Sequence, residues 1–244
     1  MVEPGLPVPD VAEKGGPRDG VPQLLDQRLY MQLSAFGGCT DAAPLVAALD
    51  AAPFGGVLYA DAADPRGVAL LTFATDPRFF VTEQRTFLNA PPFADLARKP
   101  ELTMFGRSYS IGYEPDLADT LLHRPKRAVL NADERWAVWY PLRRKGAFAA
   151  APVSEQREML KEHGTIGMAY GRAGLAHDVR LACFGMDTND NDFVVGLTGA
   201  ALHPLSKVVE EMRKTRQTSA FMDRLGPFFV GYALWQRDAR EAIA

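Results

Sequence analysis

Residues 178–199 read DVRLACFGMDTNDNDFVVGLTG, and this stretch indicates how the second half of the chain folds. The runs DVRLACFGM and DFVVGLTG are rich in aliphatic and aromatic residues, which predicts two strands. The polar run DTNDN between them resembles a calcium-binding loop, but it lacks the glycine at the sixth position and has Thr198 in place of the bidentate glutamate. A hairpin turn between the two strands is therefore predicted.

The elements on either side of this hairpin extend the pattern. They are the strand WAVWYPL (136–142), the helix EQREMLKEHGTIGM (155–168) with Ser154 as its N-cap, the helix SKVVEEMRKTRQTSAFM (206–222) and the strand FFVGYALW (228–235). The predicted order in this half is β-α-β-β-α-β.

The first half of the chain shows the same order. Its elements are the strand QRLYMQLSAF (27–36), a helix capped by Asp41, the strands GVLYADA (56–62) and VALLTFA (68–74), a helix that begins at Asp76, and the long strand ELTMFGRSYSIGY (101–113). Two consecutive split βαβ units imply an α+β fold with a duplicated ferredoxin-like architecture, in which two antiparallel sheets pack as a barrel-like unit. The expected divisions are a Pro/Gly-rich arm over residues 1–24, an N-terminal unit over 25–125 and a C-terminal unit over 126–244.

Composition excludes several classes of protein. The 244 residues are 47% apolar and 23% charged, as in a soluble globular protein, and the net charge of −3 provides no basic field for nucleic acid. The two cysteines, Cys39 and Cys183, form no CxxC pair, which argues against a disulfide framework and a thiolate metal site. With no signal-peptide pattern and no membrane-spanning apolar run, a cytoplasmic protein without membrane contact is expected.

His163 is the histidine whose setting carries the most information. It shares a predicted helix face with Met159, Ile166 and Tyr170, so its ring is expected to point inward. A lone inward histidine is more often a hydrogen-bonded core residue than a ligand. A single imidazole in an apolar pocket is also what a five-coordinate haem iron requires.

Two further groups of residues have both a structural and a functional interpretation. Arg180 lies in a strand whose two faces both look buried, so its guanidinium predicts either an internal ion pair or an anion site. Tyr140 is expected on the interior face of its strand, as a core residue or as a phenol that lines a cavity. Arg143, Arg144 and Lys145 would ordinarily form a solvated turn, but they could bind carboxylates at a cavity mouth.

The runs WYPLRR, EQREMLKEHGTIG, DVRLACFGMDTNDNDFVVGL, MRKTRQTS and LGPFFVG, in this order, resemble the chlorite dismutase family. This family of haem proteins also includes the coproheme decarboxylases of haem biosynthesis. The resemblance covers most of the chain after residue 27 and is strongest from Trp136 to Trp235. It implies haem b, or coproheme as substrate and cofactor, in the C-terminal half, and a homo-oligomer, typically a pentamer.

The resemblance also implies roles for single residues. His163, in KEHG, matches the proximal iron ligand, and Arg180 matches the distal arginine of chlorite dismutases. Tyr140, in the YP pair, matches instead the tyrosine that the decarboxylases use as a radical relay. Tyr109, Arg143 and Arg144 are expected to contact the cofactor.

This chain departs from the family pattern at several positions. Phe148 and Ala149 stand where many members have an aromatic pair. Gln217 lies near the position of a glutamate that commonly accepts a hydrogen bond from the proximal imidazole, and a neutral amide would leave that imidazole less electron-rich.

The leading functional hypothesis is a haem-dependent oxidoreductase that converts chlorite to chloride and dioxygen. In this hypothesis His163 anchors the iron and Arg180 holds the small oxyanion beside it. The alternative is peroxide-driven decarboxylation of coproheme, with Tyr140 as radical relay and Arg143 and Arg144 holding carboxylates. A third hypothesis, from another class, is a haem-binding protein without turnover.

Overall fold

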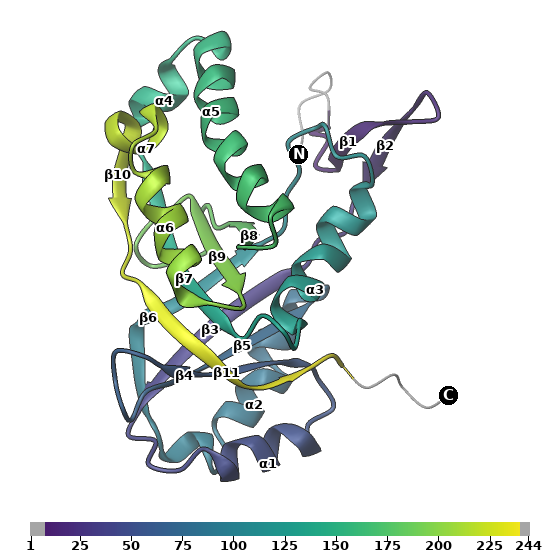
Figure 1. The fold of residues 1–244 in the computed structure, drawn as a ribbon. Coiled ribbons are helices and arrows are strands. Elements are labelled where there is room, and N and C mark those ends of the chain that lie inside the picture. Colours follow the sequence, from purple (N-terminus) through teal and green to yellow (C-terminus); the bar gives the residue numbers. More distant parts are fainter. Residues whose placement is uncertain (1–7, 240–244) are drawn as a thin grey trace.

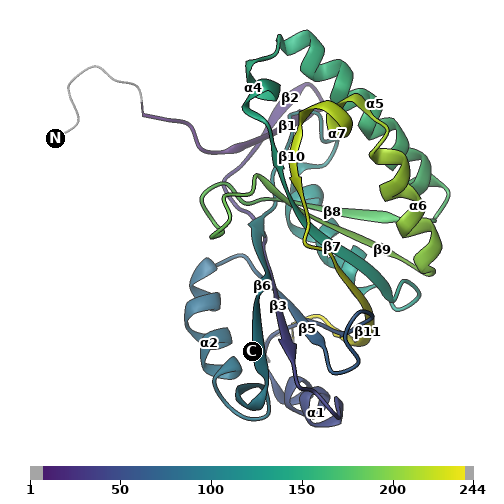
Figure 2. The same cartoon turned by 90° about the vertical axis from the view of Figure 1, so that its left-hand side faces the viewer.

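Antiparallel strands form the centre of the molecule, and helices cover them on opposite sides. The computed structural model describes residues 8–239. Figure 1 shows α1 (Ala43–Ala51) and α2 (Glu83–Leu88) against the strands of the first half, and α5 (Val153–Arg172) and α6 (Leu202–Met212) against those of the second half. Figure 2 shows the same arrangement from the side. The predicted α+β class with antiparallel strands is confirmed.

The elements of the first half follow the predicted order. The strands are β3 (Tyr30–Gly37), β4 (Gly56–Asp61), β5 (Val68–Ala74) and β6 (Ala97–Arg107), and two 3₁₀ helices, η1 (Pro77–Val81) and η2 (Phe93–Asp95), accompany α1 and α2. Pro44 lies in the first turn of α1, where its missing N–H removes no helical hydrogen bond.

A helical segment that the sequence analysis did not predict lies across the boundary between the two halves. This segment consists of the π-helical turn η3 (Asp119–His123) and α3 (Arg124–Leu130). The other elements are β7 (Trp136–Arg144), α4 (Gly146–Ala150), α5, β8 (His177–Ala182), β9 (Phe193–Gly199), α6, α7 (Arg216–Phe221), β10 (Met222–Leu225) and β11 (Phe229–Arg237).

Nine strands of the described part of the chain pair into one sheet in which the last strand of the order, β9, pairs back onto β7. The order is β10-β7-β11-β4-β5-β3-β6-β8-β9, and β9 also pairs with β7. A path along the pairings from β7 through β11 and β6 therefore returns to β7 through β9. The link between β6 and β8 is short, because only Arg107 and Ala182 face each other there. The duplicated ferredoxin-like architecture and the barrel-like packing stay predictions.

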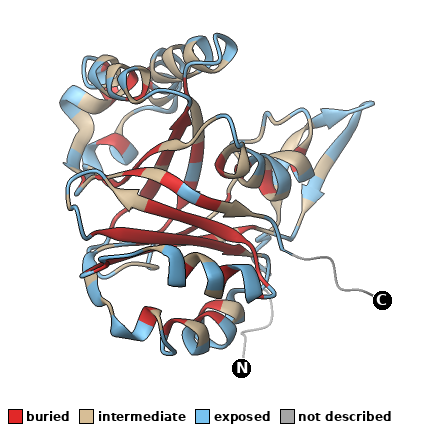
Figure 3. Ribbon diagram, turned by 60° about the horizontal axis from the view of Figure 1, so that its bottom comes forward, coloured by how far each residue is buried: buried red, intermediate tan, exposed pale blue. Residues whose placement is uncertain are grey.

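The main core lies among the strands. In Figure 3 the buried segments concentrate on the strands, while the outer faces of the helices are exposed. Trp139 on β7 is fully buried, and its indole ring lies against the backbone of Gly196 on β9. A Cβ atom at position 196 would lie 2.5 Å from that ring, so the packing of Trp139 requires a glycine there.

The predicted N-terminal arm contains a hairpin that the sequence analysis missed. Residues 1–7 of the arm lie outside the described residues. After them, β1 (Glu13–Arg18) and β2 (Val21–Leu25) pair antiparallel. The turn consists of Asp19 and Gly20, both with positive φ angles of 52° and 79°. An Asp-Gly pair is a strong signal for such a two-residue turn, and it was overlooked because the flanking segments lack alternating apolar residues.

Two long predicted helices are each divided in the structure. The helix expected from Asp76 consists of η1 and α2, and the backbone changes direction at Thr82, whose φ and ψ are −117° and −90°. The helix expected over 206–222 is divided at Thr215, which caps α7 because its side chain accepts a hydrogen bond from Thr218 N. Apolar periodicity continues across both breaks, so it could not reveal them.

Several predicted boundaries were also wrong. The strand expected over 101–113 ends at Arg107, and α5 begins at Val153, so Ser154 lies inside the helix rather than at its N-cap. Because α5 extends to Arg172, His163 lies in the middle of this helix, whereas the helix expected over 155–168 placed it nearer the end. Among residues 8–239, no helix combines the length and the apolar character needed to cross a membrane.

We expect Gly196→Ala to lower the free energy of unfolding by about 1–3 kcal/mol, because the added methyl group overlaps the buried Trp139 ring. Urea denaturation of purified protein measures this loss. The control is Gly146→Ala in α4, where a Cβ atom meets no heavy atom within 4 Å and the change should stay within about 0.5 kcal/mol. Equal stability of the two variants would contradict the packing described for Trp139.

Candidate functional site

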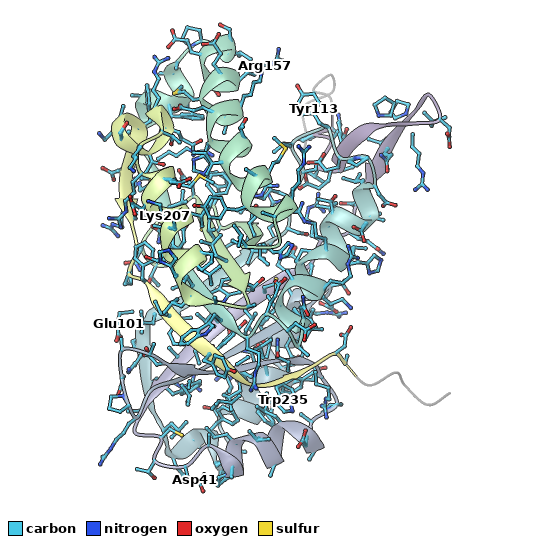
Figure 4. All side chains as sticks on the ribbon, in the orientation of Figure 1. Asp41, Glu101, Tyr113, Arg157, Lys207 and Trp235 are labelled. Atoms are coloured by element: carbon cyan, nitrogen blue, oxygen red, sulfur yellow. The ribbon has the colours of Figure 1, made fainter. Side chains whose placement is uncertain are left out.

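Strand register brings two of the predicted site residues onto one face of the sheet. Arg180 of β8 lies opposite Val195 of β9, and Val195 lies opposite Tyr140 of β7. Directly opposed residues of antiparallel strands project to the same face, so Arg180, Val195 and Tyr140 form a row across three strands. The helices α5 and α6 lie over this part of the sheet (Figure 4).

Tyr140 is buried within this face. Its side chain is 7% exposed, and its ring stacks on Phe228 with 4.7 Å between the ring centroids. Burial, and after it the charge of Asp178, raises the pKa of Tyr140 above its ordinary value. The phenol therefore keeps its hydrogen throughout the physiological pH range.

The expectation that Arg180 lies between two buried faces was wrong. Val179 and Leu181 point into the core and are buried, but the side chain of Arg180 is 46% exposed. Its Nε lies 2.8 Å from Oδ2 of Asp178, and Oδ1 of the same carboxylate lies 2.7 Å from Nη2 of Arg124. One carboxylate thus serves two guanidinium groups, and because the face above Arg180 is only partly covered, its charge is not desolvated as predicted.

His163 projects from α5 toward the start of α7. Its Nδ1 lies 3.4 Å from the hydroxyl of Thr215. Burial, followed by the positive charges of Arg144 and Arg180, lowers the pKa of His163 below its ordinary value. The imidazole is therefore neutral near pH 7, which is the form that binds metals.

Arg144 is a half-buried cation whose guanidinium makes no ion pair within residues 8–239, although the charge of Asp192 acts on it. It lies between two aromatic rings, 4.5 Å from the centroid of Phe148 and 4.7 Å from that of Phe193. The Nε atom is buried and has no hydrogen-bond partner among residues 8–239. Burial lowers the pKa of Arg144, but an arginine stays charged at neutral pH. Since a guanidinium held between two rings without an ion pair loses part of its hydration, this position favours an anionic ligand group.

The structure separates the other two predicted cofactor contacts. Tyr109, just after β6, packs its ring against Phe193 with 5.3 Å between centroids, and its pKa is raised by burial, with Arg180 and Arg144 close enough to oppose the shift. Arg143 does not belong to the cluster of charged and polar residues formed by His163, Tyr109, Arg144 and Arg180. It alternates with Arg144 along β7 and forms an ion pair with Asp190 at 2.9 Å. The prediction of a basic turn hid this division, because β7 continues through both arginines.

Gln217, at the second position of α7, is also buried beneath this region. Its side chain is 3% exposed, and its Oε1 accepts no hydrogen bond from residues 8–239. Thr215 and Gln217 thus place a hydroxyl and an amide, both neutral, at the start of α7. The pattern Thr-x-x-Thr, which is compatible with a helix N-cap, is the sequence signal that could have located this second helix start.

An open groove lies beside the cluster. It has a volume of about 890 Å³ and includes Arg124, Glu134, His177 and Asp178 in its lining. Its charged groups are mostly paired with one another, as in the contact of 2.9 Å between His177 Nδ1 and Glu134 Oε2. The groove shares Asp178 with the cluster but does not include His163, so it is a neighbouring feature rather than the site itself.

The family model for chlorite dismutase matches residues 86–234 of the chain. This match spans more than half of the sequence, so the chain belongs to the chlorite dismutase family, and the resemblance inferred from the sequence motifs is confirmed. No curated protein matches the sequence significantly.

Solved structures of low sequence identity share the fold. One is a haem-binding protein from Thermus thermophilus, with 19% identity, a TM-score of 0.67 and coverage of 85% of this chain and 92% of that one. Another is the chlorite dismutase of Candidatus Nitrospira defluvii in complex with imidazole, with 13% identity, a TM-score of 0.65 and coverage of 85% and 92%. A variant of that enzyme in complex with cyanide has 14% identity, a TM-score of 0.65 and coverage of 85% and 91%.

The charge of Arg144 should be measurable in the titration of His163. We expect Arg144→Gln to raise the pKa of His163 toward its ordinary value of about 6.5, because a positive neighbour that disfavours protonation is removed. Nuclear magnetic resonance of the imidazole protons as a function of pH measures this. Arg143→Gln is the matched control and should leave the pKa unchanged, since Arg143 is paired with Asp190 outside the cluster. Equal shifts in the two variants would argue against the proximity of Arg144 and His163.

Proposed function

We propose that this member of the chlorite dismutase family is a haem-dependent oxidoreductase, with His163 as the axial ligand of the iron. The observation that carries the proposal is the state of His163: its ring is neutral near pH 7, and its Nδ1 is occupied by the Thr215 hydroxyl. The Nε2 atom of the same ring makes no hydrogen bond within residues 8–239, which leaves it available to a metal.

The residues around His163 suit a porphyrin with acidic side chains. Ile166, Tyr170 and Phe228 are partly buried and supply apolar surface. The guanidinium of Arg144, which has no carboxylate partner among the described residues, suits a propionate. Bound haem b or coproheme would supply a redox-active iron with an open coordination position.

Arg180 is the residue that favours chlorite as substrate. Its guanidinium attracts an oxyanion and does not transfer a proton at neutral pH, so hypochlorite would remain an anion beside the arginine rather than leave as hypochlorous acid. Asp178 contacts Nε and so restrains a side chain that is 46% exposed. The overall reaction is balanced, since chlorite contains all the atoms and the charge of chloride and dioxygen.

Tyr140 supports oxidative decarboxylation of coproheme as a second candidate function. The buried phenol retains its hydrogen and lies in the same row as Arg180. As a radical relay it would lose that hydrogen and recover one from the substrate side chain. Each propionate would become a vinyl group and carbon dioxide, and peroxide would accept the two electrons and be reduced to water.

We also propose the architecture and assembly that accompany this function. The order β-α-β-β-α-β in β3 to β6 and again from β7 onward supports two ferredoxin-like units, over residues 25–125 and 126–244, after an arm over 1–24. The pairing of β11 with both β4 and β7 supports a barrel-like union of these units. Assembly into a homopentamer, without nucleic acid or membrane partners, completes the proposal.

Replacement of His163 tests the proposed ligand. We expect His163→Ala to lose tight haem binding or to change the absorption spectrum of the haem complex, because the axial nitrogen is removed. Titration of the apoprotein with haem b and with coproheme, followed by absorption, measures both. His203→Ala, on α6, is the control and should bind as the unmodified protein does. Unchanged affinity and spectrum in His163→Ala would exclude this histidine as the ligand.

Arg180→Gln and Tyr140→Phe separate the two reactions. For chlorite turnover, Arg180→Gln should weaken fluoride or cyanide binding by about 1.5–3 kcal/mol, the contribution of a charged hydrogen bond, and should reduce oxygen release. Tyr140→Phe should then have little effect.

For coproheme turnover, Tyr140→Phe should abolish peroxide-dependent decarboxylation while porphyrin binding persists. A haem complex with neither activity in the unmodified protein would favour haem binding without turnover.

A further inference from the structure

The hydroxyl of Thr215 lies at a crowded point between α6, α7 and α5. The residue is 2% exposed and caps α7. Its Oγ1 donates to the carbonyl oxygen of Met212 at 2.8 Å and accepts from Thr218 N at 3.4 Å. The Nδ1 atom of His163 approaches the same oxygen at 3.4 Å. These contacts are enough to decide which atom carries the hydrogen between the hydroxyl and the imidazole.

A threonine hydroxyl has one hydrogen and two lone pairs. The short contact with Met212 O occupies that hydrogen, because a carbonyl oxygen can only accept. Toward His163 the hydroxyl can therefore only accept, and Nδ1 must be the donor. We infer that Thr215 is a positioning residue that holds His163 in the Nδ1–H tautomer and thereby leaves the lone pair of Nε2 free for a ligand.

The consequence of this inference for bound haem rests on the proposed function. It depends on which group accepts the hydrogen bond from the His163 ring. The acceptor is a neutral hydroxyl, and no carboxylate among residues 8–239 accepts a hydrogen bond from the ring. Glu162, the adjacent acidic residue, instead accepts from Arg216 N at 3.1 Å, and Asp178 is paired with Arg180. Both of these carboxylates, like Arg144 and Arg180, act on the ring through their charge.

A neutral hydroxyl oxygen is a weaker hydrogen-bond acceptor than a carboxylate oxygen, so it pulls the Nδ1 hydrogen less strongly away from the imidazole ring. The imidazole thus keeps its neutral form and donates less electron density through Nε2 than a ring with partial imidazolate character would. The weaker donor stabilises the oxidised iron less, so the structure assigns to Thr215 a second effect, a comparatively high reduction potential of the bound haem.

The tautomer can be measured in the full-length apoprotein, without haem. Nitrogen-15 spectra of histidine-labelled protein, recorded above the pKa of His163, distinguish a protonated ring nitrogen from an unprotonated one. We expect predominantly Nδ1–H in the unmodified protein and in Thr215→Ser, which retains the hydroxyl. Thr215→Val should shift the tautomer ratio toward Nε2–H by about fivefold, the effect of losing one ordinary hydrogen bond. Thr218→Val, whose hydroxyl is 3.3 Å from Thr215 Oγ1 and is not bonded to His163, is the control and should leave the ratio unchanged.

Thr215→Asp keeps the experiment decisive if the valine variant fails to fold, because aspartate also caps helices. It places a carboxylate where the hydroxyl was, so the midpoint potential of the haem-loaded protein should fall relative to Thr215→Ser. An Nε2–H tautomer in the unmodified protein, an unchanged ratio in a folded Thr215→Val, or an unchanged potential in Thr215→Asp would each overturn the inference. Because the nitrogen-15 measurement needs no haem, it stands even if His163→Ala excludes the proposed ligand.

Discussion

The pairing of β9 between β7 and β8 is the constraint on which the rest of the candidate site depends. Val195 is opposite Arg180 on one side and Tyr140 on the other, so a one-residue shift in either pairing would turn one of these side chains to the opposite face. On the other face of the same strands, Gly196 leaves space for Trp139. The register is thus fixed by core packing, and the site residues follow from it.

The positive charges near His163 outweigh the negative ones. Arg144 and Arg180 both lower the pKa of His163, and the guanidinium of Arg144 makes no ion pair within the described residues, although the charge of Asp192 acts on it. Asp178 partly balances Arg180, but it is shared with Arg124. The cluster therefore combines a neutral imidazole with an excess of positive charge. Such a combination suits a metal centre that is approached by an anion or that carries acidic substituents.

The comparison with solved structures shows how much sequence change the fold tolerates. At 13–19% identity the fold is retained over 85% of this chain. Two departures of this sequence from the family pattern can be placed in the structure. Phe148, which stands where many members have part of an aromatic pair, packs on the guanidinium of Arg144. Thr215 supplies the contact to the His163 ring, two residues before the buried Gln217.

The sequence by itself determined eight of the strands, their order and the family, because apolar runs and turn residues are local signals, but it did not reveal β1, β2 and β10. Strands β5 and β9 lie where the runs VALLTFA and DFVVGLTG predicted them, and five short motifs, taken in their order along the chain, were sufficient to recognise the family. Only the tertiary structure decided which charges are exposed and which are paired. Arg180 looked buried because its neighbours in the chain are apolar, yet the cover over a strand face comes from distant elements. The opposite roles of Arg143 and Arg144 depended on whether β7 continued through them, and the contact of Thr215 with His163 joins residues that are 52 positions apart. Periodicity reports how a segment alternates, but burial, register and hydrogen-bond partners depend on segments that meet only when the chain has folded.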